Sequence, residues 1–583
     1  MAFKFKSGAS GMRTVRWNRG DGGNPEVYPW EAVVQMVRGQ GVDFTFGIGD
    51  SHLQLYAEKV PGIRPVNVRY EGSAPFMAMA YSRLSGKPGV CSASTGPGIA
   101  NMVPGVLEAY SGCSPLVMIC PSISQKTEGM GEFQECDQLG LMKPVTKWSA
   151  RVPHADRIPW FVRRAFSVAM NGQPGPVFLE IPSDVGGDIT HGLDMQIDPP
   201  DSVPAKKMRC AGAPALIDEA ADLILKAERP VAIAGNGTIL SGASGEFKEF
   251  VELLAVPFLT TPAGRGILSE AHPLALGLGG LYRNRVAKEV YSGADLVIAV
   301  GTRNEAFQTH RWRDFPRGAK LIQIDISPFE IGRNWVPDTA VVGDAGIVLR
   351  QLTEALKERG VGGGRFESAP RVRELTKAKR ELETELEAEC MIEATPIPAK
   401  RIVFELGRTF GDNTILVNEN GSQDTWSYVF PCYKVGEGSG CVPVAEQTCM
   451  GMGVVGAIAA KLTRPEKNVV CVTGDGAFQM YMKELPTAAQ YHAGCTWVVL
   501  NNSAFGWPKY YQVETVGWNT TSFSVQPDFV RWAEACGCYG RRVEKPDDIR
   551  PALKEALKAN EEGTPAMLDF PTGLDMSHFA GAE

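Results

Sequence analysis

The stretch CVTGDGAFQM (residues 471–480) decides how the C-terminal part of the chain is expected to fold. Residues 468–473, which lead into it, are apolar and rich in valine, as in a strand that is buried on both faces. After it, apolar side chains recur at helical spacing, at Phe478, Met482, Leu485 and Ala489. Asp475 stands between two glycines where strand changes to helix. Such a carboxylate is either part of a helix N-terminus or a ligand for something polar.

The next apolar run, residues 497–500, ends in Asn501 and Asn502. Parallel strands joined by a helix open on the same edge of a sheet, so we expect Asp475 and Asn502 to converge. Their oxygens, together with the main-chain carbonyl of Ala504, are hard ligands suited to Mg²⁺ with phosphate oxygens completing the shell. The alternative interpretation is that Asp475 caps a helix and the two asparagines form a turn.

A diphosphate is the expected partner of such a cation. Gly474 and Gly476 allow the backbone to approach a ligand closely, and a helix that begins near Ala477 offers free N–H groups. The combination of GDG, helix, apolar strand and NN is far more specific than GDG alone.

The chain as a whole reads as an α/β protein of three doubly wound parallel-sheet domains. We expect a flexible basic arm over 1–27, a first domain over 28–190, a linker over 191–214, a central nucleotide-type domain over 215–355, a charged, solvated helical linker over 356–395 and a third domain over 396–583. Apolar runs predict strands within 42–48, 65–70, 89–94, 115–120, 176–182, 229–237, 256–266, 294–304, 319–327, 413–421, 468–476, 495–502 and 565–571. The first and third domains are candidates for distant copies of one plan.

The composition argues against several classes of function. A net charge of −7 over 583 residues provides no basic field for nucleic acid. An uncharged run of about 18 apolar residues is missing from the sequence, so we expect no membrane span. The thirteen cysteines are scattered without zinc-type spacing, which fits a reduced, cytoplasmic protein.

With these motifs in place, the chain resembles the thiamine diphosphate (ThDP)-dependent enzymes, in the branch of the acetohydroxyacid synthases, pyruvate oxidases and oxalyl-CoA decarboxylases. The resemblance covers nearly the whole chain. It includes the stretches at 85–106, 131–138, 172–185 and 449–462, besides the GDG to NN motif. It implies that the three domains are a pyrimidine-binding, a central and a diphosphate-binding domain.

The resemblance also implies roles for particular residues. Glu71, after an expected strand, corresponds to the catalytic glutamate that exchanges a proton with the aminopyrimidine ring of ThDP. Met450 corresponds to the bulky residue that supports the bent cofactor, and Thr448 contacts the pyrimidine. Ser422 and Gln423 correspond to residues of the diphosphate-side loop. Without the resemblance, each has an ordinary reading as a helix-start, core or turn residue.

Several positions are candidates for substrate recognition. These are Asp50, Ser51, His52, Phe133, Gln134, Trp507, Lys509 and Glu514. Some depart from the synthase pattern, whereas Phe133 and Gln134 lie in a stretch that resembles both the synthases and the acyl-CoA branch. Asp50 and Ser51 have the alternative of capping the next helix, and His52 and the aromatic residues have the alternative of packing. In the central domain, relatives bind FAD or ADP where this chain has Arg303 and Asn304, so a bound nucleotide and an empty site are both open.

The resemblance implies a Mg²⁺-dependent lyase or transferase, an acetolactate synthase-like decarboxylase and carboligase acting on a 2-oxo acid. The alternatives are a 2-hydroxyacyl-CoA lyase or oxalyl-CoA decarboxylase, which would take an acyl-CoA, and an inactive cofactor-binding regulatory subunit. It further implies a homodimer or homotetramer, because in this family the glutamate and the diphosphate motif meet across a subunit interface.

Overall fold

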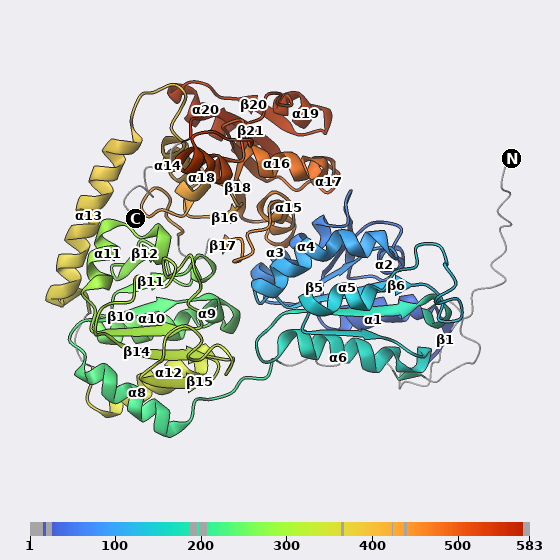
Figure 1. Cartoon of the computed structure of the whole chain (residues 1–583), viewed down its shortest axis with the longest axis horizontal. Helices are drawn as coiled ribbons and strands as arrows, with labels where there is room; N and C mark the ends of the chain where they lie inside the picture. The colour runs from blue at the N-terminus through green and yellow to red at the C-terminus, as the bar shows by residue number, and fades with distance from the viewer. Residues whose placement is uncertain are drawn as a thin grey trace. The chain divides into compact units, whose positions relative to one another are not determined.

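The computed structural model describes residues 15–18, 26–186, 195–196, 207–362, 366–422, 424–436 and 440–574. The chain divides into two compact units, the first ending at Lys207 and the second beginning at Met208. Figure 1 shows both units coloured along the chain.

The first unit contains a six-stranded parallel sheet in the order β4-β3-β5-β6-β8-β7. Its strands are β3 (Phe44–Gly47), β4 (Arg64–Asn67), β5 (Gly89–Ser92), β6 (Leu116–Ser122), β7 (Trp148–Arg151) and β8 (Pro176–Pro182). Its helices are α1 (Pro29–Gly39), α2 (His52–Ala57), α3 (Ser73–Ser85), α4 (Pro97–Ser111), α5 (Gln138–Met142), α6 (Ile158–Met170) and α7 (Ser183–Gly186). The strand order changes direction between β3 and β5, which is where α/β sheets bind ligands.

Two short stretches of the expected N-terminal arm form strands within the described residues. β1 (Val15–Asn18) pairs antiparallel with β2 (Glu26–Val27) and parallel with β9 (Met195–Gln196), which falls in the expected linker. The flexibility of the arm over 1–27 stays a prediction.

The second unit begins with a parallel sheet in the order β12-β11-β10-β13-β14-β15. Its strands are β10 (Pro230–Ala234), β11 (Phe258–Thr260), β12 (Ala275–Leu278), β13 (Leu296–Val300), β14 (Lys320–Asp325) and β15 (Thr339–Val342). Its helices are α8 (Pro214–Lys226), α9 (Asn236–Ser241), α10 (Ser244–Leu254), α11 (Arg285–Ser292) and α12 (Ala345–Glu358). This is the strand order of a doubly wound dinucleotide-type fold.

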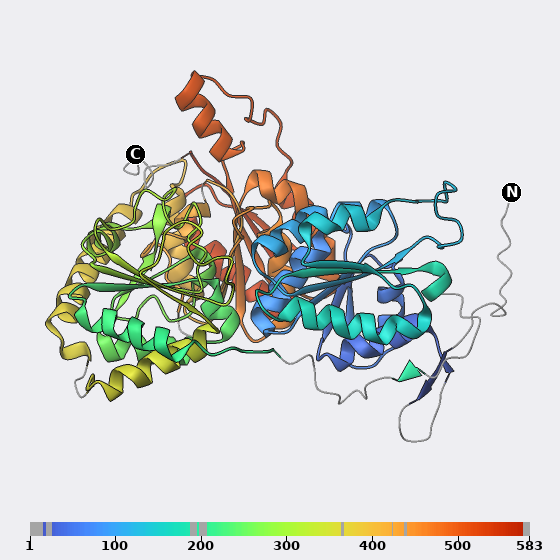
Figure 2. The ribbon, with the colours of Figure 1, turned by 60° about the horizontal axis from the view of Figure 1, so that its bottom comes forward.

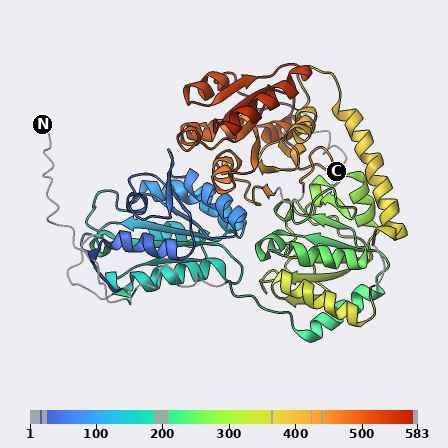
Figure 3. The ribbon, with the colours of Figure 1, turned by 180° about the vertical axis from the view of Figure 1, so that it is seen from behind.

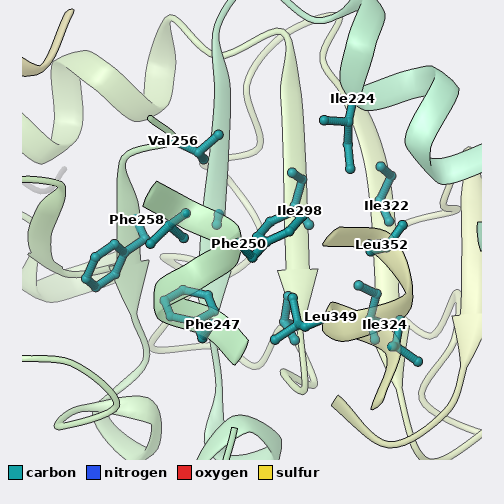
Figure 4. Close-up of a cluster of buried hydrophobic side chains, with 14 of the residues drawn as sticks. Ile224, Phe247, Phe250, Val256, Phe258, Ile298, Ile322, Ile324, Leu349 and Leu352 are labelled. Atoms are coloured by element: carbon teal, nitrogen blue, oxygen red, sulfur yellow. The ribbon is translucent and has the colours of Figure 1, made fainter. Parts of the chain in front are cut away.

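A continuous apolar core joins this sheet to the helices over one face (Figure 4). Ile322 and Ile324 point to the same face because side chains two apart in a strand share a side. Phe247 and Phe250 of α10 and Leu352 of α12 pack onto that face and are fully buried.

The third sheet, in the order β17-β16-β18-β19-β21-β20, is also parallel. Its strands are β16 (Thr414–Asn418), β17 (Cys441–Val442), β18 (Asn468–Gly474), β19 (Thr496–Asn501), β20 (Tyr539–Arg542) and β21 (Ala566–Pro571). Its helices are α14 (Ala399–Phe410), α15 (Met452–Thr463), α16 (Asp475–Tyr481), α17 (Leu485–Gln490), α18 (Gly506–Val516), α19 (Phe529–Ala535) and α20 (Ile549–Glu561). In chain order the sheet repeats the topology of the first unit, which supports the hypothesis of two copies of one plan.

The charged helix α13 (Pro370–Cys390) links the second and third sheets and lies alongside the central domain near α11 (Figures 1 and 3). We expected a solvated helix, but one face is buried. Val372, Leu375, Lys379, Leu382 and Cys390 form that face at intervals of three, four and eight residues. Lys379 Nζ donates to the His272 carbonyl (2.7 Å), which allows a lysine to occupy a buried position of the helix. A search for apolar residues alone does not detect such a position.

Candidate active site

A cavity of about 840 Å³ opens at the carboxyl end of the third sheet. The strand order reverses between β16 and β18, and the loops that follow these two strands diverge there and leave room for a ligand. Loops after β16, β18 and β19 form one side of the cavity, and residues 306–313 of the central domain form part of the other. Of the residues predicted to bind cofactor or metal, Gln423 lies outside the described residues. All the others in the second unit line the cavity: Ser422, Thr448, Met450, Gly474, Asp475, Gly476, Ala477, Asn502 and Ala504.

Asp475 and Asn502 are brought together as the sequence predicts. Gly474 at the end of β18 pairs with Leu500 of β19, so the residues that follow both strands emerge side by side. The Asn502 backbone N–H donates to the Asp475 carboxylate, whose residue is only 1% exposed. Burial raises the pKa of Asp475 to about 6, and the hydrogen bonds that its carboxylate accepts oppose the rise.

The oxygen atoms at this point fit a hard divalent cation. The residues are one carboxylate at Asp475, one amide at Asn502 and the carbonyl of Ala504, whose N–H donates to Asn502 Oδ1 (3.1 Å). Within the described ranges no group of three or more His, Cys, Asp or Glu side chains could hold a metal ion. A cation here would therefore need oxygen ligands from a bound molecule or water, as Mg²⁺ with a diphosphate has.

Close backbone packing closes the cavity around this point. A Cβ on Gly506 would lie 1.8 Å from Ser422 Oγ, and a Cβ on Gly476 would lie 2.6 Å from the Phe505 ring. Trp507 Nε1 donates to the Gly421 carbonyl (3.0 Å), which ties α18 to the loop after β16. Glycine is therefore required at both positions because a side chain would overlap the cavity wall.

Two residues that sequence reasoning missed hold the loop carrying Thr448 and Met450. Glu419 is buried and accepts from the N–H groups of Gly451 (3.0 Å) and Val454 (3.1 Å). Asn420 Nδ2 donates to the Thr448 carbonyl (2.6 Å). Burial raises the pKa of Glu419 to about 7, and its backbone donors oppose the rise. The NEN sequence before Gly421 was the available signal.

The central domain contributes a cationic turn to the cavity, which the sequence did not indicate. His310, Arg311 and Arg313 line the cavity. His310, Arg311 and Trp312 have φ values of 50°, 55° and 62°, a left-handed conformation that is unfavourable for residues with a side chain. Trp312 Nε1 donates to the Asn304 carbonyl (2.9 Å), and His310 Nδ1 lies 3.1 Å from Asp314 Oδ2, so contacts within the domain maintain the turn.

The helix α18 has no buried residue, and Figure 2 shows it, in orange-red, standing away from the third sheet. Of the three substrate candidates on it, Trp507 lines the cavity and stacks on Tyr511 with ring centroids 5.8 Å apart. Lys509 and Glu514 are not among the residues that line this cavity.

In the first unit, Glu71 lies just before α3, as predicted. Its Oε2 accepts from Asn101 Nδ2 (3.1 Å), a residue of α4. Ser51 is a helix cap, because its hydroxyl accepts from the Gln54 N–H (3.3 Å) and the residue is buried.

Four other candidates of the first unit stay predictions. The His52 ring stacks on Trp30, with centroids 5.3 Å apart, and retains an exposed edge. Partial desolvation lowers the pKa of His52, and the nearby carboxylate of Asp50 opposes this shift. Phe133 is 83% exposed and is followed by Gln134 with φ of 62°.

Comparison with known sequences agrees with this geometry. Profiles of the thiamine pyrophosphate enzymes match in chain order: the N-terminal TPP binding domain at 30–141, the central domain at 217–352 and the C-terminal TPP binding domain at 420–570. The chain belongs to the thiamine diphosphate-dependent enzymes. The fold and family predicted from the sequence are thereby confirmed.

The similar proteins lie in the acetohydroxyacid synthase branch of these ThDP enzymes. The chain is 33% identical over 562 residues to a probable acetolactate synthase large subunit of Methanococcus aeolicus, covering 93% of this chain and 91% of the relative. It is 34% identical over 556 residues to the corresponding protein of Methanocaldococcus jannaschii, with the same coverage. It is 31% identical over 539 residues to acetolactate synthase isozyme 3 large subunit of Escherichia coli, covering 91% and 92%.

None of the helices in the described part of the chain combines the length and apolar character that crossing a membrane requires.

The expected nucleotide site of the central domain lies at the end of β14. Asp325 there accepts from the Ser327 N–H (2.8 Å), and burial raises the pKa of Asp325 to about 6. Whether FAD or ADP binds at this strand end stays a prediction.

Proposed function

We propose that this ThDP enzyme is a Mg²⁺-dependent carboligase of the acetolactate synthase type, which decarboxylates a 2-oxo acid and joins the remaining fragment to a second carbonyl compound. The main support is the meeting of Asp475 and Asn502 in a cavity that also contains Thr448 and Met450. The names of the similar proteins, all acetolactate synthase subunits over nearly their full length, point to the same reaction.

The residues of the second unit would hold the cofactor. Asp475, Asn502 and the Ala504 carbonyl would bind Mg²⁺, and Ser422 would donate to a diphosphate oxygen. When bound, ThDP supplies the carbon nucleophile and the electron sink that decarboxylation requires. Met450, in the loop that Glu419 fixes, would support the bent cofactor.

Glu71 would hold and move the proton at the aminopyrimidine N1′. The side chain of Asn101 donates to Glu71 Oε2, which orients the carboxylate. We propose that two copies of the chain associate, with Glu71 of one copy completing the cavity of the other. This proposal rests on the family resemblance, and its test is the oligomeric state together with mixed-variant complementation.

Cationic and aromatic side chains in the cavity support an anionic donor. Arg311 and Arg313 provide positive charge, which a 2-oxo acid matches with its carboxylate. Trp507 and Tyr511 provide an apolar surface for the rest of the molecule. The positive charge suits the phosphates of an acyl-CoA as well, so the 2-hydroxyacyl-CoA lyase and oxalyl-CoA decarboxylase reactions are the second candidates.

The experiment that tests the proposal supplies purified protein with ThDP, Mg²⁺ and either pyruvate or an acyl-CoA donor, and measures carbon dioxide and the carbon–carbon product. We expect product from pyruvate. Turnover of only an oxalyl- or 2-hydroxyacyl-CoA would replace the carboligase proposal by its alternative. Binding of ThDP without turnover of any donor would favour a regulatory subunit.

A further inference from the structure

A row of hydrogen-bonded side chains lies behind Asp475, and the family motif does not include it. Gln526, in the segment between α18 and α19, donates through Nε2 to Asp475 Oδ2. The same Nε2 donates to Asn501 Oδ1 (3.3 Å). Gln479 of α16 donates to Gln526 Oε1 (2.8 Å). Every hydrogen of the Gln526 amide therefore has an acceptor, and its oxygen has a donor.

The network leaves only one orientation for the Gln526 amide. Asn501 Nδ2 donates to Asp569 Oδ1 (3.0 Å), an oxygen that accepts but does not donate when ionised. Burial raises the pKa of Asp569, and Arg542 Nη1, which donates to its other oxygen (3.2 Å), opposes this rise and favours the ionised form. Because the Asn501 side-chain nitrogen faces Asp569, its oxygen faces Gln526. Gln526 must therefore donate to that oxygen through its side-chain nitrogen.

The buried Asp569 therefore determines the orientation of the Asn501 amide, and Asn501 in turn determines that the Gln526 amide faces Asp475 with an N–H group. Asp569 and Asp475 are each 1% exposed, whereas Gln526 is partly exposed. A neutral amide that donates to Oδ2 supports the ionised carboxylate without adding a second negative charge. It also fixes the rotation of the carboxylate, on which the direction of its oxygens toward the cavity depends.

We infer that Gln526 is a positioning residue for the cation site, acting through Asp475. This inference rests on the proposed function, because it assumes that Asp475 binds the cation. Its effect should be larger here than in a site with several carboxylates, because within the described residues no group of three or more His, Cys, Asp or Glu side chains could hold a metal ion. Loss of a residue that orients a metal ligand typically weakens metal binding about 10–100-fold.

The test compares Gln526→Met with wild type and with Gln351→Met. Methionine retains the length of the side chain and removes the donor. Gln351 is a matched control, because it exchanges two hydrogen bonds with Gly212 in the central domain, outside the cavity. Mg²⁺ is titrated into each protein at saturating ThDP, tryptophan fluorescence reports binding, and calorimetry reports the melting temperature.

We expect the Mg²⁺ dissociation constant of Gln526→Met to rise tenfold or more, while its melting temperature falls no further than that of Gln351→Met. Gln479→Met, which removes only the donor that orients Gln526, should raise the constant by a smaller factor and serves if Gln526→Met does not fold. Mg²⁺ affinities within twofold of wild type for both Gln526→Met and Gln479→Met would overturn the inference. If wild-type protein itself shows no Mg²⁺-dependent ThDP binding, the proposed function fails instead.

Discussion

A buried ion pair within the central domain, between Arg265 and Glu270, also makes hydrogen bonds to the third domain. Arg265 is fully buried and forms two parallel hydrogen bonds with Glu270, both of 2.8 Å. Its guanidinium also donates to the carbonyls of Ser427 (2.6 Å) and Tyr433 (3.1 Å). Glu270 in turn accepts from the Val435 N–H (2.7 Å).

Replacing Arg265 by methionine would leave the Glu270 carboxylate buried, with the Val435 N–H still donating to it. Removing one partner of a buried pair costs about 3–5 kcal/mol, because the remaining charge is uncompensated. The double variant Arg265→Met/Glu270→Leu removes both charges. Its stability should return to within about 1–2 kcal/mol of wild type, since an apolar replacement of both partners is often neutral.

Differential scanning calorimetry and urea unfolding of wild type, both single variants and the double variant complete the cycle. Because Ser427 Oγ accepts from Asn418 Nδ2 (2.6 Å), at the strand end that leads to Ser422, the single variants should also bind ThDP more weakly. A loss of less than 1 kcal/mol in Arg265→Met, or a double variant as unstable as the sum of the singles, would refute the reasoning.

Three other predictions concern individual residues. Gly506→Ala should weaken ThDP binding about tenfold in titration calorimetry, because its Cβ would lie 1.8 Å from Ser422 Oγ; Gly245→Ala, with nothing within 4 Å of its Cβ, is the control and should bind normally. Burial raises the pKa of Glu446 to about 7, so the folded state holds this proton more tightly than the unfolded state, and the Glu446 contribution to stability falls as pH rises from about 4.5 through 7. Glu446→Gln should therefore increase stability at pH 8 by about 3 kcal/mol, seen as a higher melting temperature, and leave stability nearly unchanged at pH 5; an equal effect at both pH values would contradict this. Glu71→Gln should lower kcat by about 10²–10⁴ and leave ThDP affinity unchanged, and steady-state assays that find normal turnover would remove Glu71 from the mechanism.

The central strands of all three sheets were predictable from the sequence, whereas most edge strands were not. In the three six-stranded sheets, the strands that the apolar runs did not predict are β7, β12, β15, β17 and β20, and each lies at the edge of its sheet. A central strand is buried on both faces and reads as a continuous apolar run. An edge strand has one neighbour only, so it is shorter or more mixed in polarity and gives a weaker signal.

The site was predictable where one motif contains it and not where distant segments build it. Asp475 and Asn502 follow adjacent strands, so topology alone brings them together. Gln526 and His310 reach the same region through loops whose course no local pattern indicates. For Ser51 the sequence left a substrate group and a helix cap as alternatives, and the structure shows that its hydroxyl caps a helix.

The central claim is that the cavity beside Asp475 binds ThDP through a divalent cation. Isothermal titration of ThDP into wild-type protein and into Asp475→Asn, each with Mg²⁺ and with a chelator, tests it most directly. The account predicts saturable binding by wild type in Mg²⁺ only, and a loss of affinity of at least tenfold in the variant. Equal affinity with and without Mg²⁺, or undiminished binding by Asp475→Asn, would contradict it.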